Sequence, residues 1–348
     1  MKYFLRFFAL FLLLAVLTGC ASPLYYAQAV SGQMEILTKR RPIEELLADP
    51  ATPLDVRQQL ELARHLREFA SRELLLPDNR SYRTYADLER PYAVWDVFAA
   101  PELSLEPKHW CFIVAGCVPY RGYFARDKAD QFAASLKQKG YDVYVGGVPA
   151  YSTLGWFDDP VLNTFIHRSE AELAGLLFHE LAHQKIYVSG DSAFNESFAT
   201  VVELEGVKRW FEHQGTVQQT EAYRQKIKRR EEFNTLVLKH RARLKEIYAS
   251  NLSDAEKRIA KMRVFGELRN DYATLKADWG GYTVFDSWFA QDLNNAHLAA
   301  IGLYSQYVAA FQALLAQHNG DLATFYREVE RLAQLPPDER AVALQARR

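Results

Sequence analysis

The sequence is poor in cysteine and has no surplus of charge of either sign. Three of its 348 residues are Cys, and 42 Lys and Arg are balanced by 43 Asp and Glu. A nucleic-acid binder needs a basic surplus to meet the phosphates, so we expect no nucleic-acid partner. Internal repeats and low-complexity tracts are also missing. Hydrophobic residues make up 49% of the chain, which is enough for a substantial core.

Long hydrophobic runs are confined to the N-terminus. Residues 7–17 are apolar, but this run is too short for a comfortable membrane span. It follows two basic residues, Lys2 and Arg6, and leads to Leu17-Thr18-Gly19-Cys20. This arrangement resembles the signal peptide of bacterial lipoproteins, in which the Cys becomes the lipidated first residue.

From this resemblance we expect residues 1–20 to be a signal segment and Cys20 to be the lipidation site. The protein is then expected at the cell envelope, anchored to a membrane and facing the periplasm. Ala21, in place of Asp, favours the outer membrane. An uncleaved N-terminal anchor is the alternative. Residues 21–348 are expected to form one domain without a membrane-spanning helix, and the sequence leaves the oligomeric state open.

The two remaining cysteines, Cys111 and Cys117, lie six residues apart. A straight strand would hold them roughly 20 Å from each other, at about 3.3 Å per residue. They can pair only if the chain bends around Gly116. We therefore expect two buried free thiols, with a disulfide as the alternative.

Residue periodicity predicts an α+β fold that is mostly helical. Residues 42–76 show helical spacing with a break near Asp49-Pro50. A small sheet with one crossover helix follows. Its strands are predicted at 92–98, 110–115 and 141–148, and its helix at 127–139.

The rest of the chain is predicted to be almost entirely helical. The charged stretch 217–277 is interrupted at 250–252, and Ser253 with Glu256 forms a capping box that restarts the helix. We expect a protruding helical hairpin there. The predicted parts of the domain are 42–160 (helix and sheet), 161–215 (metal-binding helices), 216–278 (hairpin) and 279–348 (C-terminal helices at 295–317, 321–333 and 337–346).

The most informative motif is His179-Glu180-Leu181-Ala182-His183, on a helix that begins after the capping box of Ser169 and Glu172. Residues four apart lie on one helical face, so both imidazoles can converge on one Zn²⁺. Glu180 flanks that position, where a general base is needed to act on water. The sequence therefore predicts a catalytic zinc site.

A third ligand is expected from the next helix. The first helix should end near Tyr187, the chain should turn at Ser189-Gly190, and Asp191 or Ser192 should cap the second helix. This reversal would bring Glu196 beside the two histidines. Glu203 lies on the same face, and either orients a ligand imidazole or faces solvent.

Several segments resemble known zinc peptidases. Asn195-Glu196 with Ala199 is similar to the third-ligand segment of gluzincins, the thermolysin-like and aminopeptidase-N-like enzymes, although the spacing from the first motif is shorter. The whole chain resembles a bacterial family of predicted aminopeptidase lipoproteins. The matching segments are the signal peptide, 110–124, 150–155, 179–184, 194–199 and 293–296.

These resemblances imply a zincin-like fold and further site residues. In gluzincins an edge strand before the active helix binds the substrate main chain, so Tyr151 and Ser152 are expected to bind peptide. Asn294 and Asn295 are also candidate substrate-binding residues, or simply a helix cap. A donor to the oxyanion is required as well; the candidates are Tyr304, His297 and Tyr282.

The expected reaction is peptide-bond hydrolysis. Zn²⁺ on His179, His183 and Glu196 would polarise the carbonyl, and Glu180 would move the proton from water to the leaving amine. The family resemblance alone implies that the enzyme is an aminopeptidase. An endopeptidase of the same chemistry, or a non-catalytic envelope lipoprotein with a structural metal site, is the alternative.

Overall fold

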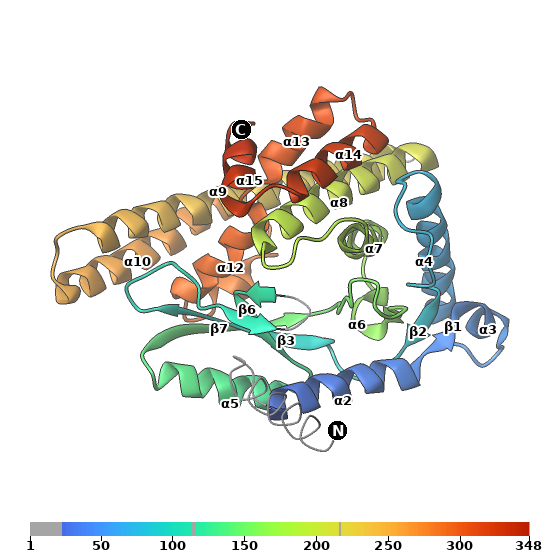
Figure 1. The fold of residues 1–348 in the computed structure, drawn as a ribbon, viewed down its shortest axis with the longest axis horizontal. Helices are drawn as coiled ribbons and strands as arrows, with labels where there is room; N and C mark the ends of the chain where they lie inside the picture. The colour runs from blue at the N-terminus through green and yellow to red at the C-terminus, as the bar shows by residue number, and fades with distance from the viewer. Residues whose placement is uncertain (1–22, 113–115, 216, 348) are drawn as a thin grey trace, which may run out of the picture.

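The computed structural model describes residues 23–112, 116–215 and 217–347, without the side chains of 217 and 303–305. The predicted signal segment and Cys20 lie outside the described residues. Within them, no helix is long and apolar enough to cross a bilayer. Figure 1 shows a small sheet with helices on both sides and two long helices that extend away from it.

The first described element is α2 (Pro23–Lys39), a helix that is not among the elements predicted from the sequence. The Gln28 side chain donates to the carbonyl of Gly122 and accepts from the amide of Phe124, so α2 covers one edge of the central sheet. The predicted helix at 42–76, with its break, is confirmed. Its two parts are α3 (Ile43–Ala48) and α4 (Leu54–Arg72).

The central sheet has the order β6-β3-β7, and β3 is antiparallel to both neighbours. Its strands are β3 (Val94–Pro101), β6 (Tyr120–Tyr123) and β7 (Tyr141–Val148), and α5 (Arg126–Lys137) is the crossover helix from β6 to β7. Trp95, Val97 and Ala99 pack against α5. A second small sheet, β1-β2-β8, contains β1 (Arg41–Pro42), β2 (Thr84–Ala86) and β8 (Val161–Leu162).

The predicted strand at 110–115 does not join the central sheet. Instead, β4 (Trp110–Phe112) pairs with β5 (Gly116–Val118) in a separate hairpin. Cys111 lies opposite Cys117 in this hairpin and forms a disulfide with it, so the expectation of two free thiols was wrong. The chain does bend at Gly116, which has φ +73°. A Cβ there would come within 2.9 Å of the Gly190 amide, so the hairpin packs closely on the turn between α7 and α8.

After β8 the described chain is helical, which confirms the expected α+β class. α9 (Val217–Ala249) and α10 (Asp254–Asp278) form the predicted hairpin and extend from the body in Figure 1. The capping box of Ser253 and Glu256 is present. The other helices are α6 (Asn163–Ile166), α7 (Glu170–Lys185), α8 (Ser192–Gln214), α11 (Asp286–Phe289), α12 (Asn295–Ser305), α13 (Val308–Gln317), α14 (Leu322–Ala333) and α15 (Pro337–Gln345).

The main core forms where α7 and α8 pack against α4 and the C-terminal helices. Phe178, Phe198, Phe311 and Phe325 are fully buried there. α7 and α8 cross closely because Gly206 of α8 lies under the Phe178 ring; a Cβ at that glycine would be 2.6 Å from the ring. Large buried aromatic side chains on both helices therefore fix the position of each helix relative to the other.

Candidate metal centre

The two motif histidines lie on one face of α7, as the spacing predicted. The Ser169 and Glu172 side chains form the capping box that begins the helix. The rings of His179 and His183 are 4.9 Å apart between centroids. Both side chains are almost fully buried, because α7 lies between the core and α8.

A short turn brings Glu196 to the histidines. α7 ends at Lys185, Gly190 adopts φ +83°, and Asp191 caps α8 by accepting from the Phe194 amide at 3.0 Å. The side chain of Asn195 bonds both the amide and the carbonyl of Val188, each at 2.8 Å. Asn195 thus fixes the turn, and the next residue points at the metal motif.

The three predicted ligands converge. Glu196 Oε2 is 3.2 Å from His179 Nε2, and Glu196 Oε1 is 3.7 Å from His183 Nε2. One donor atom from each residue lies within 4.8 Å of the others. Four ligands around zinc at about 2.1 Å lie roughly 3.4 Å from each other, so these separations fit a zinc ion.

Glu203, two turns after Glu196 on α8, orients His179. Its Oε2 is 3.3 Å from His179 Nδ1, and its Oε1 accepts from Arg230 Nη1 of α9 at 3.0 Å. Gly175 of α7 lets this side chain approach, since a Cβ there would be 3.2 Å from Glu203 Cγ. A carboxylate on the second ring nitrogen fixes the ring and leaves Nε2 free for a metal.

The charges of the ligands are set by burial and by one another. Burial lowers the pKa of His183 to about 4, which keeps this imidazole neutral. Burial opposes charge on His179 too, but its bonds to Glu196 and Glu203 raise the pKa of His179 to about 10. Burial raises the pKa of Glu203, yet Arg230 and His179 outweigh it and lower this pKa to about 2. The carboxylates thus hold a positive charge at the centre.

Among the described residues, the Glu180 side chain forms no hydrogen bond with either motif histidine. Burial raises the pKa of Glu180 to about 7, and the carboxylates of Glu196 and Asp159 add to the rise while His179 opposes it. A carboxyl group with a pKa near neutrality can both accept and return a proton. Its position beside the histidines is therefore suited to a general base.

A cavity of about 330 Å³ opens onto this centre between α7 and α9. His179, Glu180 and Glu203 line its inner end. Tyr223 of α9 also lines it, and the Tyr223 hydroxyl has no hydrogen-bond partner among the described residues. Tyr223 and Arg230 could not be identified from the sequence, because only the packing of the hairpin brings α9 to the centre.

Two of the three expected oxyanion donors, His297 and Tyr282, have partners away from the centre. His297 bonds Asn294 at the start of α12, and Tyr282 stacks on Arg229 at the base of the hairpin. The Tyr304 side chain lies outside the described residues. Tyr187 is closer: its ring centroid is 6.3 Å from that of His183, and burial and the Glu196 charge raise its pKa.

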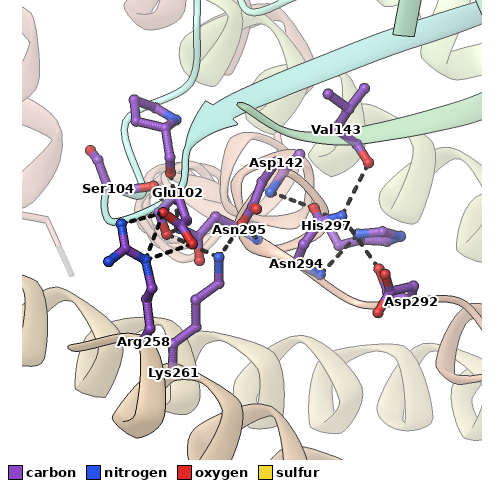
Figure 2. Close-up of polar contacts among 12 residues, drawn as sticks. Glu102, Ser104, Asp142, Val143, Arg258, Lys261, Asp292, Asn294, Asn295 and His297 are labelled. Carbon is purple, nitrogen blue, oxygen red and sulfur yellow. Dashed lines mark hydrogen bonds and ion pairs between the residues drawn. The ribbon is translucent and has the colours of Figure 1, made fainter. Parts of the chain in front are cut away.

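Asn294 and Asn295 form hydrogen bonds within the protein at the start of α12, and their expected role in substrate binding stays a prediction. Asn295 is fully buried, and its amide group donates to the carbonyls of Pro101, Glu102 and Ser104. Asn294 caps α12 and donates to the Val143 carbonyl of β7. Figure 2 shows this network between the sheet, α10 and α12. All these bonds are within the protein, so they hold α12 in place.

Tyr151 and Ser152 lie in the loop that follows β7. The Tyr151 ring packs against Phe124 at 5.0 Å between centroids, and Ser152 Oγ accepts from the Leu154 amide. Gly155 of the same loop approaches the Gln184 side chain at the end of α7. The segment is a loop beside the metal helix, and the role of Tyr151 and Ser152 in peptide binding stays a prediction.

Comparison with known proteins places the chain in a family. The model of the family described as "Putative aminopeptidase" matches residues 24–344, which is nearly the whole chain. The chain belongs to this family. No curated protein and no solved structure matches it. The family match supports a hydrolase of the aminopeptidase class. The mechanism has to be inferred from the geometry of the centre.

Proposed function

We propose that the protein is a zincin-like zinc peptidase that removes N-terminal residues from peptides. The observation that carries the proposal is the meeting of His179, His183 and Glu196 at one point, with Glu180 beside them. Two imidazoles and a carboxylate are a common ligand set of catalytic zinc sites, which leave one position open. Membership of the aminopeptidase family supports the exopeptidase assignment.

The donor set fits zinc in chemistry as well as in spacing. His183 is held neutral, as a metal ligand must be, and the proton on His179 is the one that a divalent cation would displace. His183 Nδ1 is buried without a hydrogen bond among the described residues. The other ring nitrogen, Nε2, is the one near Glu196 and is therefore the nitrogen placed to bind a metal. Zinc bound here would act as a Lewis acid on the carbonyl and would activate water.

Side chains of the protein transfer the proton, orient His179 and form the cavity for the peptide. Glu180 takes the proton from water and delivers it to the leaving amine. Glu203 and Arg230 keep His179 in one orientation. The cavity between α7 and α9 admits the peptide beside Glu180.

We propose further that a lipid on Cys20 anchors the enzyme to a membrane of the cell envelope. The exposed face of α2 supports this location. It begins three residues after Cys20, has no charged residue from 23 to 34, and presents Leu24, Val30 and Met34 with exposed fractions of 82%, 62% and 51%. Such an uncharged apolar face suits a helix that lies on a lipid surface.

The proposal is tested by a panel of aminoacyl and internally quenched peptides on the wild type and on Glu180→Gln. We expect the wild type to cleave after the first residue, to lose activity with a chelator and to regain it with Zn²⁺. Glu180→Gln should lower turnover about 10²- to 10⁴-fold at the same zinc content. Cleavage of internal bonds would indicate an endopeptidase. Zinc binding without any cleavage would indicate a structural site and contradict the proposal.

A further inference from the structure

The walls of the cavity beside the metal centre are charged. Arg168, Glu172, Leu176 and Glu180 line it and follow one another at intervals of four. They therefore share one side of α7 and of the turn before it. The opposite wall is α9, which contributes Tyr223, Lys226, Ile227 and Arg230.

Two of the three cations in this cavity are neutralised by partners. Lys226 Nζ is 2.6 Å from Glu172 Oε1, and Arg230 Nη1 is 3.0 Å from Glu203 Oε1. The Arg168 guanidinium forms no hydrogen bond or ion pair with any residue that the structure describes. The end of the cavity remote from Glu180 therefore carries one uncompensated positive charge.

The distance between Arg168 and Glu180 sets a length for the ligand. Glu170, the first residue of α7, is ten residues before Glu180, which is about 15 Å along a helix axis. An extended peptide spans about 3.3–3.6 Å per residue, so four or five residues join the two ends. A cavity of about 330 Å³ is of the size that takes a small ligand.

The positive charge of Arg168 determines which end of a peptide can bind at this end of the cavity. An amino terminus would be repelled by Arg168, whereas a carboxylate is the group that a guanidinium binds best, through two parallel hydrogen bonds. When one N-terminal residue is removed, the rest of the peptide lies on the C-terminal side of the scissile bond. Only that side can extend to Arg168.

We propose that Arg168 binds a substrate carboxylate four or five residues beyond the scissile bond, so that short peptides with a free C-terminus are the preferred substrates. The proposal rests on the proposed peptidase function. The same chemistry would accept an Asp or Glu side chain at that position of a longer peptide. In both cases Arg168 is a specificity residue and takes no part in the bond cleavage itself.

The test compares leucyl-tetraalanine as a free acid and as an amide, and two longer amide-terminated peptides with Asp or Asn as the fifth residue. Kinetics are measured on the wild type, Arg168→Gln and Arg224→Gln. Arg224→Gln is the matched control, because it removes one positive charge from α9 outside this cavity. If no peptide is cleaved, the same four peptides are ranked by calorimetric binding.

In the wild type we expect kcat/KM for the acid to exceed that for the amide about tenfold, mainly through KM. Arg168→Gln should abolish this preference by lowering kcat/KM for the acid to that for the amide, and Arg224→Gln should keep it. A preference in the Asp and Asn pair alone assigns the site to a side-chain carboxylate. An acid-to-amide ratio that is equal in wild type and Arg168→Gln, in turnover or in binding, overturns the proposal. That outcome is distinct from failure of the peptidase function, in which no peptide is cleaved.

Discussion

At the scale of single residues, three neighbouring side chains have different charges because their partners differ. His183 has one nitrogen without a partner and is kept neutral by burial, while His179 lies between two carboxylates. Glu180 contacts neither histidine through a hydrogen bond among the described residues and has a pKa near neutrality. The motif spacing predicts which residues meet, but the neighbours from α8 and α9 decide their protonation.

Arg230 should affect the metal centre from a distance. Its removal leaves Glu203 without its cation, so the carboxylate should orient His179 less well. We expect Arg230→Gln to weaken zinc binding about 10-fold to 100-fold in competition with a chelator. Arg224→Gln on the same helix is the control and should bind zinc like the wild type. Equal affinities in all three proteins would show that the Arg230 contact has no influence on the metal.

Asp159 makes the stability of the fold depend on pH. This carboxylate accepts from the Thr153 amide and hydroxyl, yet burial raises its pKa from 3.8 to about 6. Nearby Asp158 adds to the rise, and Arg40 opposes it. Because the pKa of Asp159 is higher in the folded protein than in the unfolded protein, protonation of Asp159 stabilises the fold. This stabilisation is complete below the unfolded pKa and is lost as the pH rises through about 6.

The variant Asp159→Asn cannot ionise and should not show this loss. Between pH 4 and pH 8, the free energy of unfolding of the wild type should fall by about 3 kcal/mol relative to the variant, at 1.36 kcal/mol per pKa unit. Denaturant unfolding of both proteins at the two pH values measures the difference. A difference between the proteins that does not change with pH would contradict this account.

At the scale of secondary structure, the helices of the metal site and the hairpin were predictable because their signals are local. Capping boxes at Ser169 and Ser253 and the turn at Gly190 mark helix ends within a few residues. The third ligand followed from the same turn. The pairing of β4 with β5 and the disulfide were not predicted, because they depend on a bend at Gly116 and on the packing of Gly116 against Gly190.

The Asn294 and Asn295 pair shows the limit of the sequence at this scale. An amide pair at a helix start looks the same whether it bonds substrate or its own backbone, and only the fold brings the carbonyls of 101, 102 and 104 to Asn295. We expect Asn295→Ala to lower the free energy of unfolding by about 3 kcal/mol, because it leaves buried carbonyls unpaired. Asn294→Ala, which loses a helix cap, should cost about 1 kcal/mol.

Denaturant unfolding measures both losses, and peptide kinetics separate structure from binding. A structural role leaves KM unchanged in the folded fraction of each variant. A small loss of stability with a large rise in KM would instead support the interpretation of Asn294 and Asn295 as substrate contacts.

At the scale of the whole molecule, α2 and α5 lie along one side of the central sheet, and α8, α13 and α14 lie on the other side in Figure 1. A lipid on Cys20 and the apolar face of α2 would both direct the first side towards the membrane. α7 lies between these two layers of helices. The enzyme would then hold its metal centre above the lipid surface.

This orientation predicts contact of α2 with lipid. In the lipidated protein bound to phospholipid vesicles, a spin label at Val30→Cys should be more accessible to oxygen than to a water-soluble nickel complex. A label at Gln312→Cys, exposed on α13, should show the reverse. A label at position 30 that is as accessible to the nickel complex as the one at 312, with the protein still on the vesicles, would contradict the orientation.

The central claim is that side chains from α7 and α8 form one metal site, and zinc calorimetry on the metal-free protein tests it most directly. The wild type should bind one zinc ion, and Glu196→Ala, which loses one of three ligands, should bind it at least about 100-fold more weakly. The Glu205→Ala variant, altered on the same helix away from the centre, should match the wild type. Unchanged zinc affinity in Glu196→Ala would contradict the account.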